Sequence, residues 1–451
     1  MSVREWQWLG VAGSTLVAVG GLFVGVGPSG DAVQLPHDAV AAILWPMAVC
    51  YLGMSLLILA WWAIGRLRPE PAVVIRTAVM WAIPFTLSGP IFSRDVYSYL
   101  AQGAMTAAGI DPYRWGPSAL GGELAANVPP IWQDTPAPYG PVFLRLAGAV
   151  TTLTRHELWP GLIGMRLLAV AGVALLAVTL PRIARECGAD PSTALRLGVL
   201  NPLVLLHLLV DAHNDAVMIA LMCAGLLLAL RHRPVLGAVL ITLSGLVKGP
   251  ALLSLAFLAV LWAGRLPGRF RLVRAVGATL VISGGTAVAV TTIAGTGFGW
   301  IPALRAPTRA RTWMSLTTDL GGLLGAREAV WLAGLLLAWA ITLLLLHRVG
   351  TGADMVAALG SALVAFVLLS PVVHVWYLLW GLVPLAAAGA ERARRLAACA
   401  SPVLVLLAPP NDAPPGAPLV LGGVLGTAAG LLVYTVVQAT RRRTGLVLDA
   451  A

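Results

Sequence analysis

The sequence predicts an all-α polytopic membrane protein, and two features of its composition point to this class. Hydrophobic residues make up 59% of the 451 residues and charged residues only 11%, whereas a soluble domain carries about a quarter charged residues. The apolar residues fall in closely spaced runs, and a helix that crosses a bilayer needs about 20 such residues. Inside a bilayer each backbone polar group must be satisfied within its own segment, so these runs are expected to be helices. Residues 1–451 are expected to form a single transmembrane domain.

Fourteen apolar runs are expected to span the membrane. The first of them is interpreted as an uncleaved span, because no cleavage site followed by a soluble domain comes after it. The runs between 197 and 263 and at 396–409 are short, so the expected number of membrane spans is 13 to 14. The predicted spans are 9–27, 39–63, 74–92, 162–181, 197–211, 214–230, 235–248, 250–263, 273–295, 329–346, 353–371, 375–390, 396–409 and 417–438.

The basic residues predict the orientation of these spans. Of the 30 Lys and Arg residues, about 20 fall in every second connection and in the two tails, although the other side holds the longest loops. Cytoplasmic loops of membrane proteins are enriched in Lys and Arg, so both termini are expected in the cytoplasm and the chain in the plasma membrane. The net charge of +11 is thereby explained without a nucleic-acid partner.

Two long outer loops, 93–160 and 296–328, contain most of the basic residues that fall on the other side. Within the first loop, the apolar segment 142–153 is too short to span and is expected to be a helix lying in the interface. The glycines of 295–299 follow a span and not a strand, so they do not predict a nucleotide site. The four cysteines are scattered without metal or redox spacing and are interpreted as apolar fillers.

The first polar cluster with chemical potential follows the third span. Arg94 and Asp95 lie at the predicted mouth of a helix, where a low dielectric can shift the pKa of a carboxylate and make it a useful base. Tyr97 and Tyr99 follow in the same segment. The alternative is an ordinary helix cap with interfacial aromatic anchors.

Two further clusters lie at outer ends of predicted spans. Proline and glycine around Tyr139 (residues 135–141) predict a rigid loop over a cavity, or an inert lid. Residues 211–215 place two carboxylates, an imidazole and an amide between apolar runs, which is costly within a bilayer. A metal bound by His213 and Asp215 is conceivable, but the spacing of a zinc site is absent, so contacts to a polar substrate are favoured.

The last two clusters carry potential cationic groups. Lys248 splits an apolar stretch with Gly249 and Pro250, and such broken helices place charge beside bound anions; a snorkelling lysine is the alternative. His374, Trp376 and Tyr377 join two spans, where the histidine could contact a phosphate or move a proton and the aromatics could be interface anchors.

All five clusters fall on the predicted outer side. A transporter would more often place polar residues at mid-membrane and show internal symmetry, and neither is seen. The asymmetry therefore favours an enzyme whose chemistry occurs outside the cytoplasm. A transporter or lipid-glycan flippase remains the alternative from another class.

The chain resembles the actinobacterial polyprenol-phosphate-mannose-dependent α-1,6-mannosyltransferases of the GT-C class of membrane glycosyltransferases. The resemblance covers most of the chain and rests on six motifs. They are SRDVYSYLAQG (93–103), GIDPY (109–113), PAPYGPVFL (136–144), DAHNDAVMIALMCAG (211–225), LVKGPALL (246–253) and SPVVHVWYLLW (370–380). Val375 departs from the pattern, in which proline is expected after the histidine.

The resemblance implies a GT-C-type bundle with a large first functional loop and a reaction outside the cytoplasm. Asp95 would be the general base that deprotonates a mannose 6-hydroxyl, and inversion at a β-linked polyprenyl-phosphate-mannose would give an α-linked product. The acceptor would be a lipid-linked α-mannan of lipomannan and lipoarabinomannan core synthesis. Another lipid-phosphate sugar, such as arabinose, is the alternative within the class.

The resemblance also suggests which residues bind the two substrates. A phosphate leaving group needs positive charge in the transition state and no nucleotide loop, so neither a metal nor another cofactor is expected. The expected partners are the donor lipid, the lipid-linked acceptor and membrane lipids. The donor phosphate is expected to contact Arg94, Lys248, His374, Arg305 and Arg309. The sugar or the acceptor is expected to contact Tyr97, Tyr139, His213, Asn214, Asp215, Trp376 and Tyr377.

Overall fold

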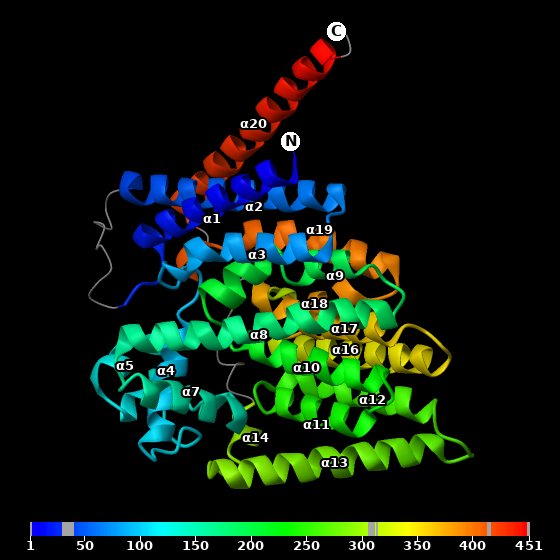
Figure 1. Cartoon of the computed structure of the whole chain (residues 1–451). Coiled ribbons are helices and arrows are strands. Elements are labelled where there is room, and N and C mark those ends of the chain that lie inside the picture. Colours follow the sequence, from blue (N-terminus) through cyan, green and yellow to red (C-terminus); the bar gives the residue numbers. More distant parts are fainter. Residues whose placement is uncertain (1, 29–39, 305–311, 313, 413–415, 449–451) are drawn as a thin grey trace.

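The computed structural model describes residues 2–28, 40–304, 312, 314–412 and 416–448. In these residues every regular element is a helix, which confirms the predicted all-α class (Figure 1). The first half of the chain forms α1 (Val3–Val24), α2 (Val40–Leu67), α3 (Pro71–Thr86), α4 (Asp95–Ala107), η1 (Pro117–Ala119), α5 (Gly122–Ala126), α6 (Pro130–Gln133), α7 (Pro141–Leu153), α8 (Leu158–Glu186), α9 (Pro191–Gly198), η2 (Val204–Val210) and α10 (Asp215–Leu230). The second half forms α11 (Pro234–Gly245), η3 (Gly249–Leu252), α12 (Leu253–Ala263), α13 (Arg271–Ala294), α14 (Trp300–Ala303), α15 (Leu316–Leu323), α16 (Arg327–Gly350), α17 (Met355–Leu368), η5 (Val375–Leu378), α18 (Leu379–Ala387), α19 (Glu391–Leu407), η6 (Pro410–Asp412) and α20 (Ala417–Leu448).

Several helices are suited to cross a bilayer. Among the described residues, five helices are long and apolar enough by themselves, in α1, α2, α8, α13 and α16. A sixth span results if η2 and α10 form one broken span, with a bend of 113° between the two helices. Shorter apolar helices of 10 to 17 residues pack between them. The chain is therefore a polytopic membrane protein.

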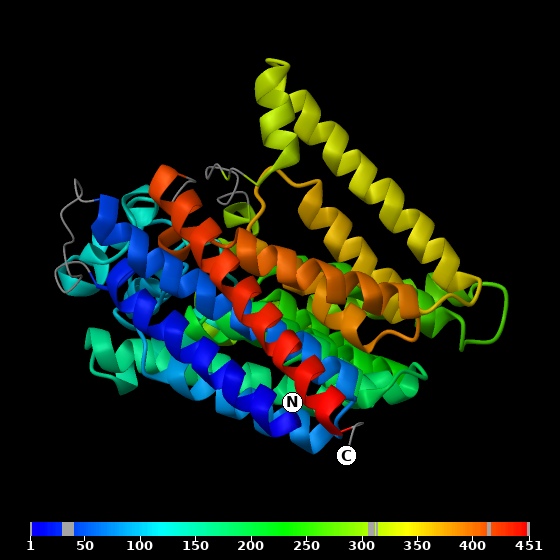
Figure 2. The same cartoon turned by 90° about the horizontal axis from the view of Figure 1, so that it is seen from above.

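Helices α13 and α16 show the surface that such a protein presents to lipid. Only 11% of the apolar window of α13 and 17% of that of α16 is buried inside the protein. Ile293 on α13 is 84% exposed and Leu343 on α16 is 62% exposed. A soluble monomer does not expose apolar surface on this scale, so these faces fit the hydrocarbon of a bilayer. In Figure 2 the long α16 stands apart from the body of the bundle.

Each of the fourteen predicted spans coincides with a helix or a helix pair, but several are broken where one rod was expected. The run 197–211 contains the end of α9, a break and then the π-helical η2. The runs that begin at 250 and 375 each start with a 3-10 turn, η3 and η5. The run 74–92 ends as a helix at Thr86, just before Gly89 and Pro90. These breaks put turns beside the candidate site.

Close helix contacts in the bundle depend on small residues. An added Cβ on Gly13 of α1 would lie 2.8 Å from the Gly53 carbonyl oxygen of α2. On α4, a Cβ on Gly103 would lie 2.7 Å from the Ala147 carbonyl oxygen of α7. Small residues let membrane helices approach closely and gain packing contacts that lipid cannot supply. The α4–α7 contact confirms a short helix at 142–153 and fixes it against the helix that carries Asp95.

The bundle has two chemically different ends. Figure 1 shows α4, α5 and α7 together at one end, at the left of the view. At the other end, arginine-rich connections meet: Arg231 pairs with Glu186 at 2.7 Å, and Arg265 donates to the Leu230 carbonyl at 2.9 Å. Asp354 links a further loop there by accepting from the Gly389 amide at 2.6 Å. The candidate residues and the basic loops are thus segregated, as the sequence predicted.

Candidate active site

Asp95 is the first residue of α4 and lies on a polar cavity of about 190 Å³. Its side chain is 24% exposed. Its backbone amide donates to Ser93 Oγ at 3.2 Å, and the helix N-terminus favours a negative group at this position. Ser98 and Gln102 follow on the same face of α4, at the i+3 and i+7 spacing that aligns helical side chains.

Other segments complete this cavity. The loop after α6 contributes Thr135, Pro138 and Tyr139, and the segment before η5 contributes Val372 and His374. The Ser98 hydroxyl and Gln102 Oε1 are buried, and within the described residues neither has a hydrogen-bond partner. Buried polar atoms are normally satisfied. The cavity therefore has a carboxylate on its wall and, in two of its lining side chains, buried polar atoms that are not paired within the described part of the chain.

A buried carboxylate holds the turn that precedes Asp95. Asp211, at the end of η2, is fully buried, and its Oδ1 accepts from the backbone amides of Ile91 at 2.9 Å and Phe92 at 3.0 Å. Charge-assisted bonds to backbone amides are among the stronger hydrogen bonds in proteins. Asp211 thereby fixes the start of α4 against the turn that carries His213.

Arg166 of α8 clamps the same region. Its guanidinium donates to the carbonyls of Ser88 at 2.6 Å and Val210 at 2.8 Å. Further bonds reach the carbonyls of Thr86 and Leu209 at 3.2 and 3.3 Å. The end of α3 and the end of η2 are both carbonyl-rich, and one planar cation satisfies both.

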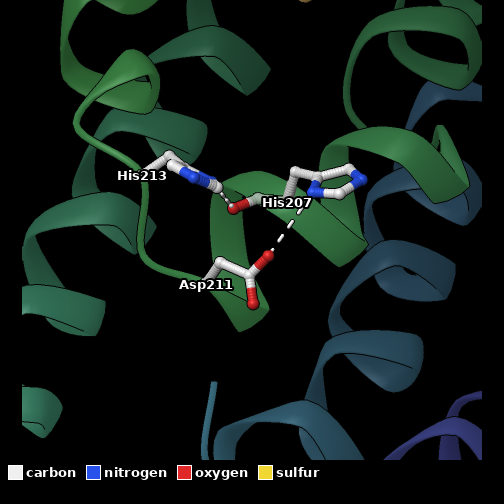
Figure 3. A group of neighbouring side chains, drawn as sticks. All are labelled: His207, Asp211 and His213. Carbon is white, nitrogen blue, oxygen red and sulfur yellow. Dashed lines mark hydrogen bonds and ion pairs between the residues drawn. The ribbon is translucent and has the colours of Figure 1, made fainter. Parts of the chain in front are cut away.

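His213 lies directly behind Asp95. Its Nε2 is 3.6 Å from Asp95 Oδ2, and its Nδ1 is 2.8 Å from the His207 carbonyl oxygen. Ala212, in the left-handed region at φ 52°, turns the chain so that His213 faces inward. Figure 3 shows His213 directed at the His207 carbonyl, and the His207 ring directed at Asp211.

His207, Asp211 and His213 form the one metal-type group found among the described residues, with one donor atom each within 4.8 Å of one another (Figure 3). A carbonyl oxygen only accepts hydrogen bonds, so the 2.8 Å contact requires a proton on His213 Nδ1. That nitrogen is then unable to bind a metal as arranged. His207 Nδ1 lies 3.4 Å from Asp211 Oδ2, an ion-pair distance, and within the described residues neither atom has a hydrogen-bond partner. Of the donor atoms of this group, His213 Nδ1 is thus the one that hydrogen bonding already occupies.

Lys248 and Asp215 form a buried ion pair in the same region. The ammonium lies 2.8 and 3.0 Å from the two carboxylate oxygens of Asp215, and Trp380 Nε1 donates to the same carboxylate. The ammonium also lies 4.6 Å from the Tyr377 ring centroid, a cation–π distance. Lys248 lines a second, mainly apolar cavity of about 250 Å³ with Leu304, Phe366 and Trp380. The two cavities share a wall made by Pro138, Tyr139, Val372 and Tyr377.

An aromatic stack separates the polar cavity from the interior. Trp376 lies between His213 and His374, with ring centroids 4.4 and 4.3 Å away. Tyr377 stacks on Trp380 at 4.5 Å. These contacts fix the ring of His374 at the cavity and leave Trp376 only 3% exposed.

The environment of the cavity shifts the pKa values of its titratable groups, among them Asp95 and His374. Desolvation raises the pKa of Asp95 to about 6, with the Lys248 charge opposing and the Asp215 charge adding to the rise. Desolvation lowers the pKa of His374 to about 3, and the Lys248 charge adds to this. His374 is therefore neutral near pH 7 and offers one N–H, while Asp95 is poised as a base close to neutrality.

The structure brings together only part of the predicted set. Asp95, Tyr139, His374 and Tyr377 line the polar cavity, and Lys248 lines the neighbouring one. Arg305 and Arg309 lie outside the described residues.

The remaining predicted residues lie behind the cavity walls. Tyr97 is buried and donates its hydroxyl to the Val26 carbonyl at 2.7 Å. Arg94 donates to the Asn127 carbonyl at 3.2 Å and lies over the Tyr97 ring. No more than 3% of any of the others is exposed, and none lines either cavity: His213, Asn214, Asp215 and Trp376. As arranged, these six side chains support the site and do not contact a ligand in it.

Sequence reasoning missed several residues of the site. Ser98 and Gln102 could have been found from the sequence, because they lie three and seven positions after Asp95 and so share its face of a helix. Arg166 lies within the predicted span 162–181 and Trp380 ends the motif 370–380, so each was visible in the sequence. Their partners were not, because these belong to segments far away in the chain.

The fold and the site define a polytopic membrane protein with a carboxylate in a polar cavity beside an apolar cavity. Residues 7–264 match the family model described as alpha-(1->6)-mannopyranosyltransferase, N-terminal domain, and residues 308–438 match the MptB C-terminal domain. The chain belongs to this alpha-(1->6)-mannopyranosyltransferase family. The predicted single domain stays a prediction beside these two matched regions.

Individual relatives agree with this membership. A probable alpha-(1->6)-mannopyranosyltransferase of Mycolicibacterium smegmatis is 34% identical over 86% of this chain and 79% of its own length. An alpha-(1->6)-mannopyranosyltransferase of Mycobacterium tuberculosis is 32% identical over 90% and 82% of the two chains. Alpha-(1->6)-mannopyranosyltransferase B of Corynebacterium glutamicum is 32% identical over 85% and 73%. No solved structure matches the chain.

Proposed function

We propose that the protein transfers mannose from polyprenyl-phosphate-mannose to the 6-hydroxyl of an α-mannoside on a lipid-linked glycan, in lipomannan and lipoarabinomannan core synthesis. Family membership and the names of the relatives support mannosyl transfer with α-1,6 linkage. One observation carries the proposal for the site. Asp95 lies in a polar cavity that shares its wall with an apolar cavity lined by Lys248. A sugar acceptor and a lipid phosphate need two such compartments side by side.

The polar cavity suits the acceptor sugar. Ser98 and Gln102 line this cavity and hold buried polar atoms, unpaired among the described residues, which a rotation of the side chain would turn toward sugar hydroxyls. Asp95 accepts the proton of the attacking hydroxyl. The acceptor oxygen then forms a bond to the anomeric carbon as the bond from that carbon to the phosphate oxygen breaks. Attack opposite the phosphate inverts a β-linked donor into an α-linked product.

The apolar cavity suits the donor lipid. Leu304, Phe366 and Trp380 offer an apolar wall for the first part of a polyprenyl chain, and Lys248 lies at the same cavity. Negative charge grows on the phosphate as it leaves, and a fixed cation stabilises that charge most in a dry site. His374 contributes a neutral N–H from the side of the acceptor. These groups fit a reaction that uses no metal or other cofactor, because a phosphate is already a good leaving group.

The proposed orientation places the site outside the cytoplasm. The arginine-rich end of the bundle, with Arg231 and Arg265, is assigned to the cytoplasm together with both termini. The end with α4 and α7 then faces outward in the plasma membrane, where the acceptor glycan approaches over the 93–160 loop.

The test compares Asp95→Asn with Asp111→Asn in membranes given radiolabelled polyprenyl-phosphate-mannose and short α-1,6-mannosides. Asp111 is an exposed carboxylate in the same loop. Loss of a general base reduces kcat by about 10²- to 10⁴-fold, so Asp95→Asn is expected to fall in that range. Asp111→Asn is expected to match the wild type. Transfer by Asp95→Asn within tenfold of the wild type would remove Asp95 as the base. Transfer of arabinose from the corresponding donor, without transfer of mannose, would replace the proposed sugar.

A further inference from the structure

His213 is fully buried, so it does not contact a sugar, yet it is the imidazole next to the proposed base. Its ring lies between Asp95 and the His207 carbonyl, and Trp376 stacks on it at 4.4 Å. A buried imidazole in such fixed surroundings has a defined tautomer. That tautomer decides what it offers to Asp95.

The contact at 2.8 Å to the His207 carbonyl requires the proton to be on Nδ1. In the neutral imidazole, Nε2 then carries a lone pair and no proton. This nitrogen is buried, has no hydrogen-bond partner within the described residues, and lies 3.6 Å from Asp95 Oδ2. An ionised Asp95 places two lone pairs opposite each other, whereas a protonated Asp95 has an O–H that can donate to this nitrogen once the two atoms approach from 3.6 Å to hydrogen-bond distance.

We propose that His213 is the positioning residue of the base. The proposal rests on the proposed function. The acceptor O–H bond breaks as an O–H bond forms on the Asp95 carboxyl, and that new O–H donates to His213 Nε2. The proton stays on Asp95, and His213 stabilises it there. His213 thus makes Asp95 a stronger base without touching the substrate.

Other groups also face Asp95. The Tyr99 hydroxyl, on the same helix, lies 3.4 Å from its Oδ2 and favours the ionised form. The positive charge of Lys248 favours the ionised form too, but Asp215 is bound to it at 2.8 Å and opposes it. Asp211 adds a further negative charge. Tyr139, His374 and Tyr377 line the same cavity. His213 Nε2 lies 3.6 Å from Asp95 Oδ2 and comes from another element of the chain.

The test is the pH profile of kcat for His213→Leu, with His207→Leu as the matched control. Leucine keeps the site apolar but removes the lone pair. Both histidines are buried and both contact Trp376. The hydrogen bond from His213 Nδ1 goes to the backbone carbonyl of His207, so His207→Leu keeps this bond. His213→Leu is expected to move the acidic limb of the kcat profile to lower pH by roughly one unit, a ~tenfold change in the proton affinity of Asp95, and to lower kcat by up to about tenfold, because a weaker base transfers the proton more slowly. KM for the acceptor is expected to stay within about twofold. His207→Leu is expected to keep the wild-type limb.

Two further measurements keep the proposal falsifiable. In an Asp95→Asn background, His213→Leu is expected to have no additional effect on the residual rate, because His213 acts through Asp95. If His213→Leu does not reach the membrane, His213→Met is measured in its place with the same expectation. Two results would overturn the proposal. One is a kcat–pH profile of His213→Leu whose acidic limb coincides with that of the wild type. The other is an acidic limb that shifts equally in His213→Leu and His207→Leu. Failure of the proposed function would instead appear as no mannosyl transfer by the wild type.

Discussion

Lys248 and Asp215, 33 positions apart in the chain, form a buried ion pair in which the ammonium contacts both carboxylate oxygens, at 2.8 and 3.0 Å. The carboxylate is fully buried and the lysine side chain is 10% exposed, on the side of the apolar cavity. Asp215 thus holds the lysine in place, and the charges of the two groups balance. Under the proposed function the pair has a structural role in the fold and a phosphate-binding role, and mutations can separate the two.

The first prediction concerns this pair. Removing one partner leaves an unpaired buried charge, which costs about 3–5 kcal/mol. Asp215→Leu alone and Lys248→Met alone are therefore expected to lower the thermal midpoint in detergent. The double variant is expected to recover most of that loss, because no charge is left unpaired.

Activity separates the two roles. The double variant is expected to be stable but to transfer mannose at least about 10²-fold more slowly, because the phosphate has lost its cation. The control is Arg231→Met with Glu186→Leu, which removes an exposed pair at the other end of the bundle. Wild-type rates in the Lys248/Asp215 double variant would show that this ion pair only supports the fold.

The second prediction follows from the pKa of Asp95, raised by burial from 3.8 to about 6. A raised pKa means that the folded protein binds this proton more tightly than the unfolded chain between about pH 4 and 6. The contribution of Asp95 to the free energy of unfolding is therefore fully present below about pH 4 and is lost as the pH rises through about 6. Activity needs the ionised base and is expected to rise through the same interval.

Asp95→Asn tests both halves of this relation, because the amide mimics the neutral carboxyl. The variant is expected to melt at a higher temperature than the wild type at pH 7.5, and this difference is expected to shrink toward pH 4.5. Thermal melts across this range measure it, with Asp111→Asn as the exposed control. A variant less stable than the wild type at pH 7.5 would contradict the raised pKa.

The helices were predictable from the sequence, but the contacts of the site were only partly so. Apolar runs predicted the helical segments because burial in lipid demands continuous hydrophobicity. Asp95, Lys248 and His374 were predictable because charged groups beside apolar runs are costly and stand out. The pairing of Lys248 with Asp215 and the inward turn at Ala212 were not, because they depend on which helices are neighbours and on backbone breaks.

Arg166 shows the same limit from another direction. Its sequence context, within an apolar helix, predicts only an outer basic residue. Its four carbonyl contacts arise from the ends of α3 and η2, which helix packing brings together. Residues of this kind support a site without any motif of their own.

The third prediction concerns this clamp. Arg166→Met leaves four carbonyls without their charged donor, and hydrogen bonds to charged groups contribute about 1.5–3 kcal/mol each. The variant is expected to lose at least that much stability, and Arg166→Lys is expected to recover only part, because an ammonium lacks the planar fork. The exposed Arg185→Met on the same helix is the control. A thermal midpoint of Arg166→Met equal to that of Arg185→Met would show that the clamp contributes nothing.

The last prediction tests which end of the bundle faces outward. Glu123 lies exposed in α5, at the end that carries Asp95, and Arg269 lies exposed in the connection between α12 and α13, at the arginine-rich end. With Cys50, Cys187, Cys223 and Cys399 replaced, a single cysteine is placed at one of these two positions. A membrane-impermeant maleimide is expected to label Glu123→Cys in intact cells, and Arg269→Cys only after permeabilisation. The positive-inside bias requires this result, and so does the proposed function, in which the donor reacts outside the cytoplasm. The reverse pattern would place Asp95 in the cytoplasm and would exclude a donor that reacts outside it.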